Sequence, residues 1–323
     1  MSIEILMIVG FCIAAYSIVA NDAPQTLGTF ISSNSHRPWW VLWLYTSVIL
    51  VAVLFYGWYT SGTGDASYHR LEPIPFPAEG ITLLYIIPPI LILILTRFGI
   101  PVSTTFLVLT IFAPSNLGSM LIKSMMGYAV AFVTAIVIYR FVLKKVSVYF
   151  HKTRDLPPTT GWIILQWIAT AFLWSQWLVQ DLANIFVYLP RQVSLEMMYF
   201  ATTVFVVLLG YIFYQRGGAI QQIVNSKTGV TDIRSATIVD FIYAFILLVF
   251  KEWSNMPMST TWVFLGLLAG REFAYSMTLQ IDSKATSLMV SKDAMKLFLG
   301  LAMSIILATS LPWLYEHITN FFS

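Results

Sequence analysis

The chain has 323 residues, of which 58% are hydrophobic and only 10% are charged. A soluble domain carries about 25% charged residues, so this composition excludes a soluble globular protein and indicates a polytopic membrane protein. The net charge of +3 gives no reason to expect a nucleic-acid partner, and the single cysteine excludes an intramolecular disulfide and any multi-cysteine metal site.

Long apolar stretches predict the membrane segments, because about 20 apolar residues span the hydrocarbon core as a helix. We therefore predict an all-α polytopic membrane protein with about ten membrane segments. Two segments begin at a polar break, where we expect broken or re-entrant helices. In chain order, the predicted segments are roughly 3–32, 40–60, 80–97, 98–117, 118–142, 161–188, 196–214, 235–250, 257–275 and 293–316.

Basic residues predict the orientation. A cluster of lysines and arginines lies between positions 140 and 154, at the junction of the two halves. Positive charge favours the cytoplasmic side, so we expect this linker inside and both termini outside a multi-pass protein of the cell membrane. Each half would then cross an odd number of times. This predicts an inverted-topology repeat, with residues 1–150 as the first copy and 155–323 as the second.

One motif occurs once in each half: a proline, one apolar residue and three hydroxyl residues. The proline breaks an incoming helix, and serine and threonine favour the start of a new one. The free N–H groups and the positive dipole end of such a start bind anions. The alternative is that the hydroxyls only serve helix packing or bond back to their own helix. The two copies are Pro101-Val102-Ser103-Thr104-Thr105 and Pro257-Met258-Ser259-Thr260-Thr261.

A second polar motif precedes each of these, and it contains an aspartate flanked by amides. Ser103 follows Asp22 by 81 positions, and Ser259 follows Asp181 by 78. Two motifs recurring at such similar spacing indicate an internal duplication. An ionisable residue at membrane depth is a functional candidate, although each aspartate alone is equally compatible with a helix end at the membrane surface. The two copies are Asn21-Asp22-Ala23-Pro24-Gln25 and Gln180-Asp181-Leu182-Ala183-Asn184.

These paired motifs resemble those of the inorganic phosphate transporter (PiT) family, which includes phosphate permeases and some sulfate permeases. That family carries Ala-Asn-Asp-x-Ala-Asn and Pro-Val-Ser-Thr-Thr signatures in each half. This sequence departs from them at Pro24-Gln25, at Gln180, and at Phe106 and Trp262, where the family often has histidine. The matching positions are Ala20-Asn21-Asp22, Pro101 to Thr105, Asp181, Ala183, Asn184, Pro257 and Ser259 to Thr261.

The resemblance implies a secondary active transporter of inorganic phosphate, coupled to sodium or protons by alternating access, in a homodimer. It implies no cofactor besides the coupling ion. The alternatives are a sulfate permease of the same family and an uncoupled anion channel. An enzyme is not expected, because the sequence lacks the Gly-x-Ser-x-Gly and His-Glu-x-x-His motifs.

Candidate site residues fall into two groups. Asn21, Asp22, Gln180 and Asp181 are expected to bind the coupling ion, with sodium at Asp22 and Asp181. The amides of Gln25, Gln180 and Asn184 can donate to an anion or bind a cation through their oxygens, so their roles stay open. The expected substrate-binding residues are Ser103, Thr104, Thr105, Ser259, Thr260, Thr261, Gln25 and Asn184.

Overall fold

The structure is a computed structural model that describes residues 3–142, 149–150, 153, 157–228 and 232–279, with isolated positions between 288 and 310. All regular structure within these residues is helical. The α-helices are α1 (Ile3–Ser33), α2 (Trp39–Thr60), α3 (Ile87–Arg97), α4 (Thr110–Phe112), α5 (Leu117–Val137), α7 (Thr160–Asp181), α8 (Ala183–Phe186), α9 (Leu195–Tyr214), α10 (Gly218–Thr228), α11 (Ile233–Trp253) and α12 (Thr260–Leu279), and the shorter 3-10 and π turns are η1 (Leu83–Ile86), η2 (Thr105–Leu109), η3 (Pro114–Asn116) and η4 (Ile138–Val142).

Six of the described helices are long and apolar enough to span a membrane. The prediction of an all-α polytopic membrane protein is therefore confirmed. Most of the predicted segment 293–316 lies outside the described residues. The six candidate spans are Glu4–Ser33, Trp39–Thr60, Pro114–Phe141, Thr160–Phe186, Leu195–Tyr214 and Ile233–Trp253.

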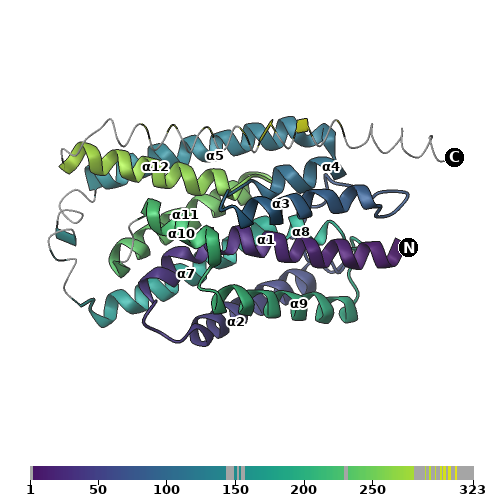
Figure 1. Cartoon of the computed structure of the whole chain (residues 1–323), viewed down its shortest axis with the longest axis horizontal. Helices are drawn as coiled ribbons and strands as arrows, with labels where there is room; N and C mark the ends of the chain where they lie inside the picture. The colour runs from purple at the N-terminus through teal and green to yellow at the C-terminus, as the bar shows by residue number, and fades with distance from the viewer. Residues whose placement is uncertain are drawn as a thin grey trace.

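Helix α1 runs through the middle of the bundle (Figure 1). Helices α5 and α12 lie on one side of it, and α2 and α9 lie on the other. α1 also contacts α3, α7, α10 and α11. Its central position explains why Phe11, Ile18 and Phe30 are completely buried. The first aspartate motif, which lies on α1, is therefore held at the core of the molecule.

Helices α5 and α12 approach each other closely through glycines. A Cβ atom at Gly266 or Gly270 would collide with the carbonyl oxygens of Tyr128 and Phe132 on α5. Small residues four positions apart are typical of close helix packing in membranes, where backbones must approach to gain van der Waals contact. This packing fixes the start of α12, and with it the second Ser-Thr-Thr motif.

The first Ser-Thr-Thr motif starts a helix that is too short to cross the bilayer. Residues 104–112 form helical turns, of which η2 is a π-helix, and Pro114 then begins a new turn. At 1.5 Å per residue this helix is about 14 Å long, whereas the hydrocarbon core measures about 30 Å. The predicted segment 98–117 is thus a re-entrant piece that pairs with α3. In the second half, α11 ends at Trp253 and α12 restarts at Thr260.

The stretch 215–234 connects the predicted segments 196–214 and 235–250, and the sequence predicts no helix there. It contains α10, which packs against α1, and the Gln221 side chain donates to the Gly28 carbonyl at 2.9 Å. The helix is polar, so its sequence lacks the apolar signal that marks the other segments. It forms because α1 offers it backbone acceptors and a packing surface.

Candidate functional site

The first aspartate motif is built on α1, which continues through Pro24. Proline has no N–H, so the Ala20 carbonyl loses its intrahelical donor. Asp22 is 1% exposed, and Asn21 Nδ2 donates to its Oδ1 at 2.6 Å. The same Asn21 nitrogen donates to the Val102 carbonyl at 2.9 Å, which ties α1 to the first Ser-Thr-Thr break.

The second aspartate motif lies at the junction of α7 and α8, where the intervening Leu182 keeps a helical backbone conformation. α7 ends at Asp181, and α8 begins at Ala183. Asp181 is fully buried, and Asn184 Nδ2 donates to its Oδ1 at 2.8 Å. The corresponding amide in the first half, Gln25, lies 3.5 Å from Asp22 Oδ1. Each carboxylate thus faces the amide three positions after it, as the duplication predicts.

Both Ser-Thr-Thr motifs begin with a serine that caps its helix. Ser103 Oγ accepts from the Phe106 N–H at 3.2 Å, and Ser259 Oγ accepts from the Trp262 N–H at 3.4 Å. These bonds satisfy one of the N–H groups left free at a helix start. The Phe106 and Trp262 rings also meet edge to face, with centroids 5.5 Å apart. The two helix starts therefore lie against each other.

The third residues of the two motifs make reciprocal contacts across this junction. Thr105 Oγ1 donates to the Met258 carbonyl at 3.1 Å, and Thr261 Oγ1 donates to the Val102 carbonyl at 3.2 Å. Each acceptor is the residue just before the opposite serine. Matched residues thus make matched contacts in both directions, which is the behaviour expected of a two-fold arrangement.

The aspartates join the same cluster as the hydroxyls. Thr104 Oγ1 donates to Asp22 Oδ2 at 2.8 Å. Asn184 Nδ2 lies 3.1 Å from Thr104 Oγ1 and 3.2 Å from Thr105 Oγ1, so the second aspartate motif contacts the first Ser-Thr-Thr motif. The twelve predicted site residues are all at most 5% exposed: Asn21, Asp22, Gln25, Ser103, Thr104, Thr105, Gln180, Asp181, Asn184, Ser259, Thr260 and Thr261.

Gln180 points away from this cluster. Its amide nitrogen donates to the Leu247 carbonyl at 2.8 Å, and its oxygen accepts from Arg70. None of its bonds in the described part of the chain goes to Asp181 or to a motif hydroxyl. Gln180 therefore differs from Asn21, which bonds directly to its neighbouring aspartate.

Three buried oxygen atoms of the cluster have no hydrogen-bond partner among the described residues: Gln25 Oε1, Asp181 Oδ2 and Asn184 Oδ1. An unpaired buried acceptor costs about 1–3 kcal/mol, so these atoms favour a partner that the described residues do not supply. Carboxylate and amide oxygens are hard ligands that suit a cation such as sodium. The cluster thus offers oxygen ligands to a cation and helix starts to an anion.

Arg70 is a functional candidate that the sequence did not reveal. The 61–79 stretch connects the predicted segments 40–60 and 80–97, yet Arg70 within it is completely buried. Its guanidinium donates to Gln180 Oε1 and, at 3.2 Å, to the Ser254 carbonyl just before the second Ser-Thr-Thr motif. The motif positions of Gln180 and Ser259 indicate a site, but nothing local to residue 70 predicts that an arginine reaches it.

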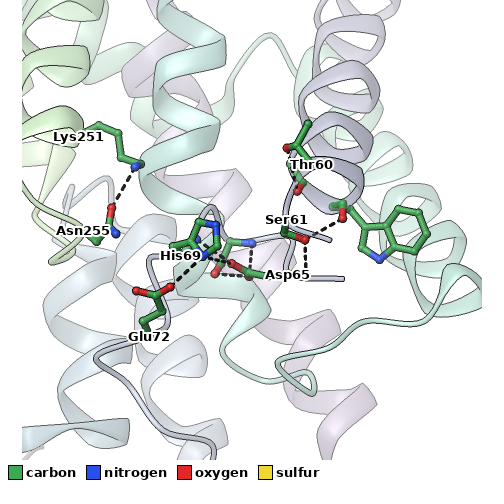
Figure 2. A network of polar contacts seen from close by, with 10 residues as sticks. Thr60, Ser61, Asp65, His69, Glu72, Lys251 and Asn255 are labelled. Carbon is green, nitrogen blue, oxygen red and sulfur yellow. Dashed lines mark hydrogen bonds and ion pairs between the residues drawn. The ribbon is translucent and has the colours of Figure 1, made fainter. Parts of the chain in front are cut away.

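The loop that carries Arg70 is held in one shape by its own polar contacts (Figure 2). Asp65 accepts from the backbone N–H of His69 at 2.7 Å, and His69 Nδ1 lies 2.8 Å from Glu72 Oε1. Tyr68 and His69 have φ values of 56° and 64°, a left-handed conformation that is uncommon outside glycine. This turn directs the chain inward at the next residue, Arg70.

Lys123 contacts the same stretch of backbone before the second Ser-Thr-Thr motif. It lies on α5 and is 4% exposed, and its ammonium donates to the Ser254 and Met256 carbonyls, both at 2.6 Å. The backbone before the second Ser-Thr-Thr motif therefore accepts hydrogen bonds from two basic side chains, Arg70 and Lys123. Neither residue is close to the motif in sequence.

No protein-family model matches the sequence, and no curated protein matches it. A solved structure described as the sodium-dependent phosphate transporter is similar to this chain, with a TM-score of 0.63. The similarity covers 98% of this chain and 100% of the other, at 16% sequence identity. At that identity the likeness shows a common fold over the whole chain.

Proposed function

We propose that this chain is a secondary active transporter of inorganic phosphate, coupled to sodium or protons, which works by alternating access around the central cluster. The observation that carries this proposal is that two helix starts and two buried aspartates meet in one cluster. Each half of the chain contributes one helix start and one aspartate. The fold, shared with a sodium-dependent phosphate transporter, supports it.

In this proposal the two helix starts bind the anion. Each supplies roughly half a positive charge together with free N–H groups and hydroxyls. No described Lys or Arg donates to the Ser-Thr-Thr side chains, so the positive potential comes from the backbone dipoles together with Arg70 and Lys123 behind the second motif. The carboxylates of Asp22 and Asp181 bind the coupling ion beside it, with the unpaired oxygens Gln25 Oε1 and Asn184 Oδ1 as further ligands.

Phosphate is favoured over sulfate by the aspartates. Phosphate at neutral pH still carries a proton, which a carboxylate such as Asp22 or Asp181 can accept in a hydrogen bond. Sulfate has no such proton and leaves a buried carboxylate facing a second anion. A sulfate permease with the same architecture is the alternative, and it would need both carboxylates neutralised.

A pocket of about 220 Å³ offers a route to the cluster between α1, α3, α9 and the start of α10. Ala20, Thr96 and Arg97 line it, and Thr96 Oγ1 lies 3.5 Å from Asn21 Oδ1. The positive charge of Arg97 favours the approach of an anion. In the proposed cycle this pocket is one of the two access paths.

We also propose that residues 1–150 and 155–323 form two inverted repeats within the chain, with both termini outside the cell. The chain would then be a member of the PiT family and form a homodimer. The reciprocal threonine contacts support this arrangement. In a Cys12→Ser background, single cysteines at Ser61 and Gln215 should be labelled by a membrane-impermeant reagent from opposite sides. Labelling of both positions from one side would contradict the orientation.

Uptake by proteoliposomes tests the function. Labelled phosphate and sulfate are supplied separately, with sodium and proton gradients imposed one at a time. The proposal predicts phosphate accumulation above the outside concentration, driven by one of these gradients. Preferential accumulation of sulfate would establish the alternative substrate. Uptake that only equilibrates phosphate, whatever the gradient, would establish an uncoupled channel.

A further inference from the structure

Asp240 is a buried carboxyl group outside the central cluster. It lies on α11 and is 1% exposed. The Thr29 hydroxyl of α1 is 2.5 Å from its Oδ1, and the Thr170 hydroxyl of α7 is 2.8 Å from its Oδ2. Three helices that are distant in sequence thus contribute to one small polar group.

This group lies on one side of the central cluster. Thr29 follows Asp22 by seven residues on α1, a rise of about 10 Å. Thr170 precedes Asp181 by eleven residues on α7, a rise of about 16 Å. Asp240 is therefore displaced from both aspartates toward the C-terminal end of α1.

Asp240 has no ion pair with a Lys, Arg or His of the described chain. An isolated ionised carboxylate is very costly to bury, so a group in this position takes up a proton or binds a cation. The titratable and charged residues on the helices around it are Asp22 on α1, Asp181 on α7, Lys123 on α5, Tyr139 on η4, Tyr243, Arg234 and Lys251 on α11, and the paired Arg271 and Glu272 on α12.

The contacts of Asp240 suit a proton rather than a metal cation. Each carboxyl oxygen already meets one hydroxyl, and no oxygen of Asp240, Thr29 or Thr170 is left unpartnered. A sodium ion would need several further oxygens, whereas a proton needs only one carboxyl oxygen. The protonated group can donate to one threonine hydroxyl, which then donates to a carbonyl of its own helix.

A column of polar side chains connects this group with the end of α1. Ser33 Oγ donates to the Thr29 carbonyl at 2.7 Å, and Gln166 Nε2 donates to Ser33 Oγ at 2.6 Å. Asn34 Nδ2 donates to Gln166 Oε1 at 2.8 Å, and Arg37 donates to Asn34 Oδ1 at 3.2 Å. Arg37 lies beyond the end of α1 and is partly exposed.

We infer that Asp240 is a proton-binding site, separate from the central cluster, which exchanges its proton with the aqueous phase at the C-terminal end of α1 during transport. The exchange step rests on the transport function proposed above, whereas proton binding does not. The proton moves between a carboxyl oxygen of Asp240 and water that reaches Thr29 and Thr170 along the polar column. The first half has no acid in the corresponding region, 81–85, so only the second half supplies a carboxyl group of this kind.

Infrared spectroscopy of the purified full-length protein tests proton binding directly. A protonated carboxyl group has a carbonyl band distinct from that of a carboxylate. We expect the band of one protonated carboxyl at neutral pH to disappear in Asp240→Asn and to persist in Glu252→Gln, which changes an exposed carboxyl on the same helix. If the spectrum of Asp240→Asn still contains every protonated-carboxyl band of the parent, Asp240 does not bind a proton at neutral pH.

A second variant guards against misfolding of Asp240→Asn. Thr170→Val keeps the carboxyl group and removes one hydroxyl that stabilises its ionised form. The band should then persist to a higher pH than in the parent. If the band disappears at the same pH in Thr170→Val as in the parent, Thr170 does not contact the carboxyl group that binds the proton.

Transport measurements test proton exchange. At a fixed sodium gradient, an imposed pH gradient should change phosphate uptake by the parent and by Glu252→Gln, and the effect should be lost in Asp240→Asn. Retention of the full pH effect in Asp240→Asn would overturn the exchange. If the parent takes up no phosphate under any gradient, the proposed function fails, and the infrared result still decides whether Asp240 binds a proton.

Discussion

The two aspartate motifs occupy matching positions in the chain but have different electrostatic surroundings. Asp22 accepts from Asn21 and from Thr104, which are neutral donors. Asp181 accepts from Asn184, while its neighbour Gln180 bonds to the buried guanidinium of Arg70. Among the described residues, only the second motif has a cation bonded within it. A duplicated sequence has thus produced two half-sites that differ in fixed charge.

The charge of Arg70 is permanent under physiological conditions. Burial lowers the pKa of its guanidinium to about 10, and the nearby Asp181 carboxylate acts in the opposite direction. Arg70 consequently stays protonated at neutral pH and places a fixed positive charge near Asp181. No described basic residue bonds to Asp22, so in the proposed cycle a mobile cation or proton balances its charge. Coupling should therefore depend on Asp22 in a way that Arg70 cannot replace.

Removing either carboxylate should have the largest effect. Asp22→Asn and Asp181→Asn keep the size of the side chain and remove its charge, so each should abolish ion-driven phosphate uptake by a folded protein. Only Asp181→Asn removes the nearby carboxylate that favours the charged form of Arg70, and a buried charge left without compensation destabilises the fold. We expect the double variant Asp181→Asn/Arg70→Gln to recover stability in thermal unfolding, while Asp22→Asn/Arg70→Gln does not. Equal recovery in both would remove the distinction between the half-sites.

Replacing Arg70 alone should have the next largest effect. Arg70→Gln removes hydrogen bonds of a charged group, each worth about 1.5–3 kcal/mol, and leaves Asp181 in need of a mobile cation. Uptake should fall on the order of tenfold, and its dependence on sodium concentration should become steeper. Arg70→Lys should retain more activity, and the exposed Arg216→Gln should behave as the parent. A sodium dependence unaltered by Arg70→Gln would show that this charge plays no part in coupling.

Deleting single hydroxyls in the cluster should have a moderate effect. Thr104→Val and Thr260→Val keep the shape of the side chain and remove the donor. A buried acceptor left unpaired costs about 1–3 kcal/mol, so phosphate should bind at least several-fold more weakly in each variant. Equilibrium binding of labelled phosphate or sulfate checks this. If both variants bind as tightly as the parent, the hydroxyls serve packing and the anion site lies elsewhere.

The smallest predicted effect is on stability, and it tests whether Thr105 and Thr261 occupy equivalent positions. Thr105→Val and Thr261→Val each remove one of the reciprocal bonds to a backbone carbonyl. Both should lower the free energy of unfolding by a similar amount, about 1 kcal/mol. Thermal unfolding in detergent compares them. A loss confined to one of the two variants would contradict the equivalence of these positions.

The membrane segments and the central cluster were predictable from the sequence because their signals are local. Runs of apolar residues mark the helices, and recurring motifs mark Asp22, Asp181 and the two Ser-Thr-Thr starts. Pairing of the motifs also predicted that they would meet, and Asn184 does contact Thr104.

The remaining features depend on tertiary structure. Arg70 and Lys123 reach the second motif from a loop and from α5, and no local pattern indicates those contacts. Asp240 looks like a residue near the start of a helix, yet α1 and α7 enclose it with Thr29 and Thr170. Helix α10 is too polar to be recognised from a run of apolar residues in the sequence. Each depends on partners supplied by distant parts of the chain.

The linkage between sodium and phosphate binding tests the central claim most directly. If the coupling ion binds beside the anion at Asp22, sodium must lower the Kd for phosphate, and phosphate must lower that for sodium by the same factor. We predict that sodium strengthens phosphate binding to the parent protein relative to choline and has no effect on Asp22→Asn. An equal strengthening by sodium in Asp22→Asn would contradict a coupling site at this residue.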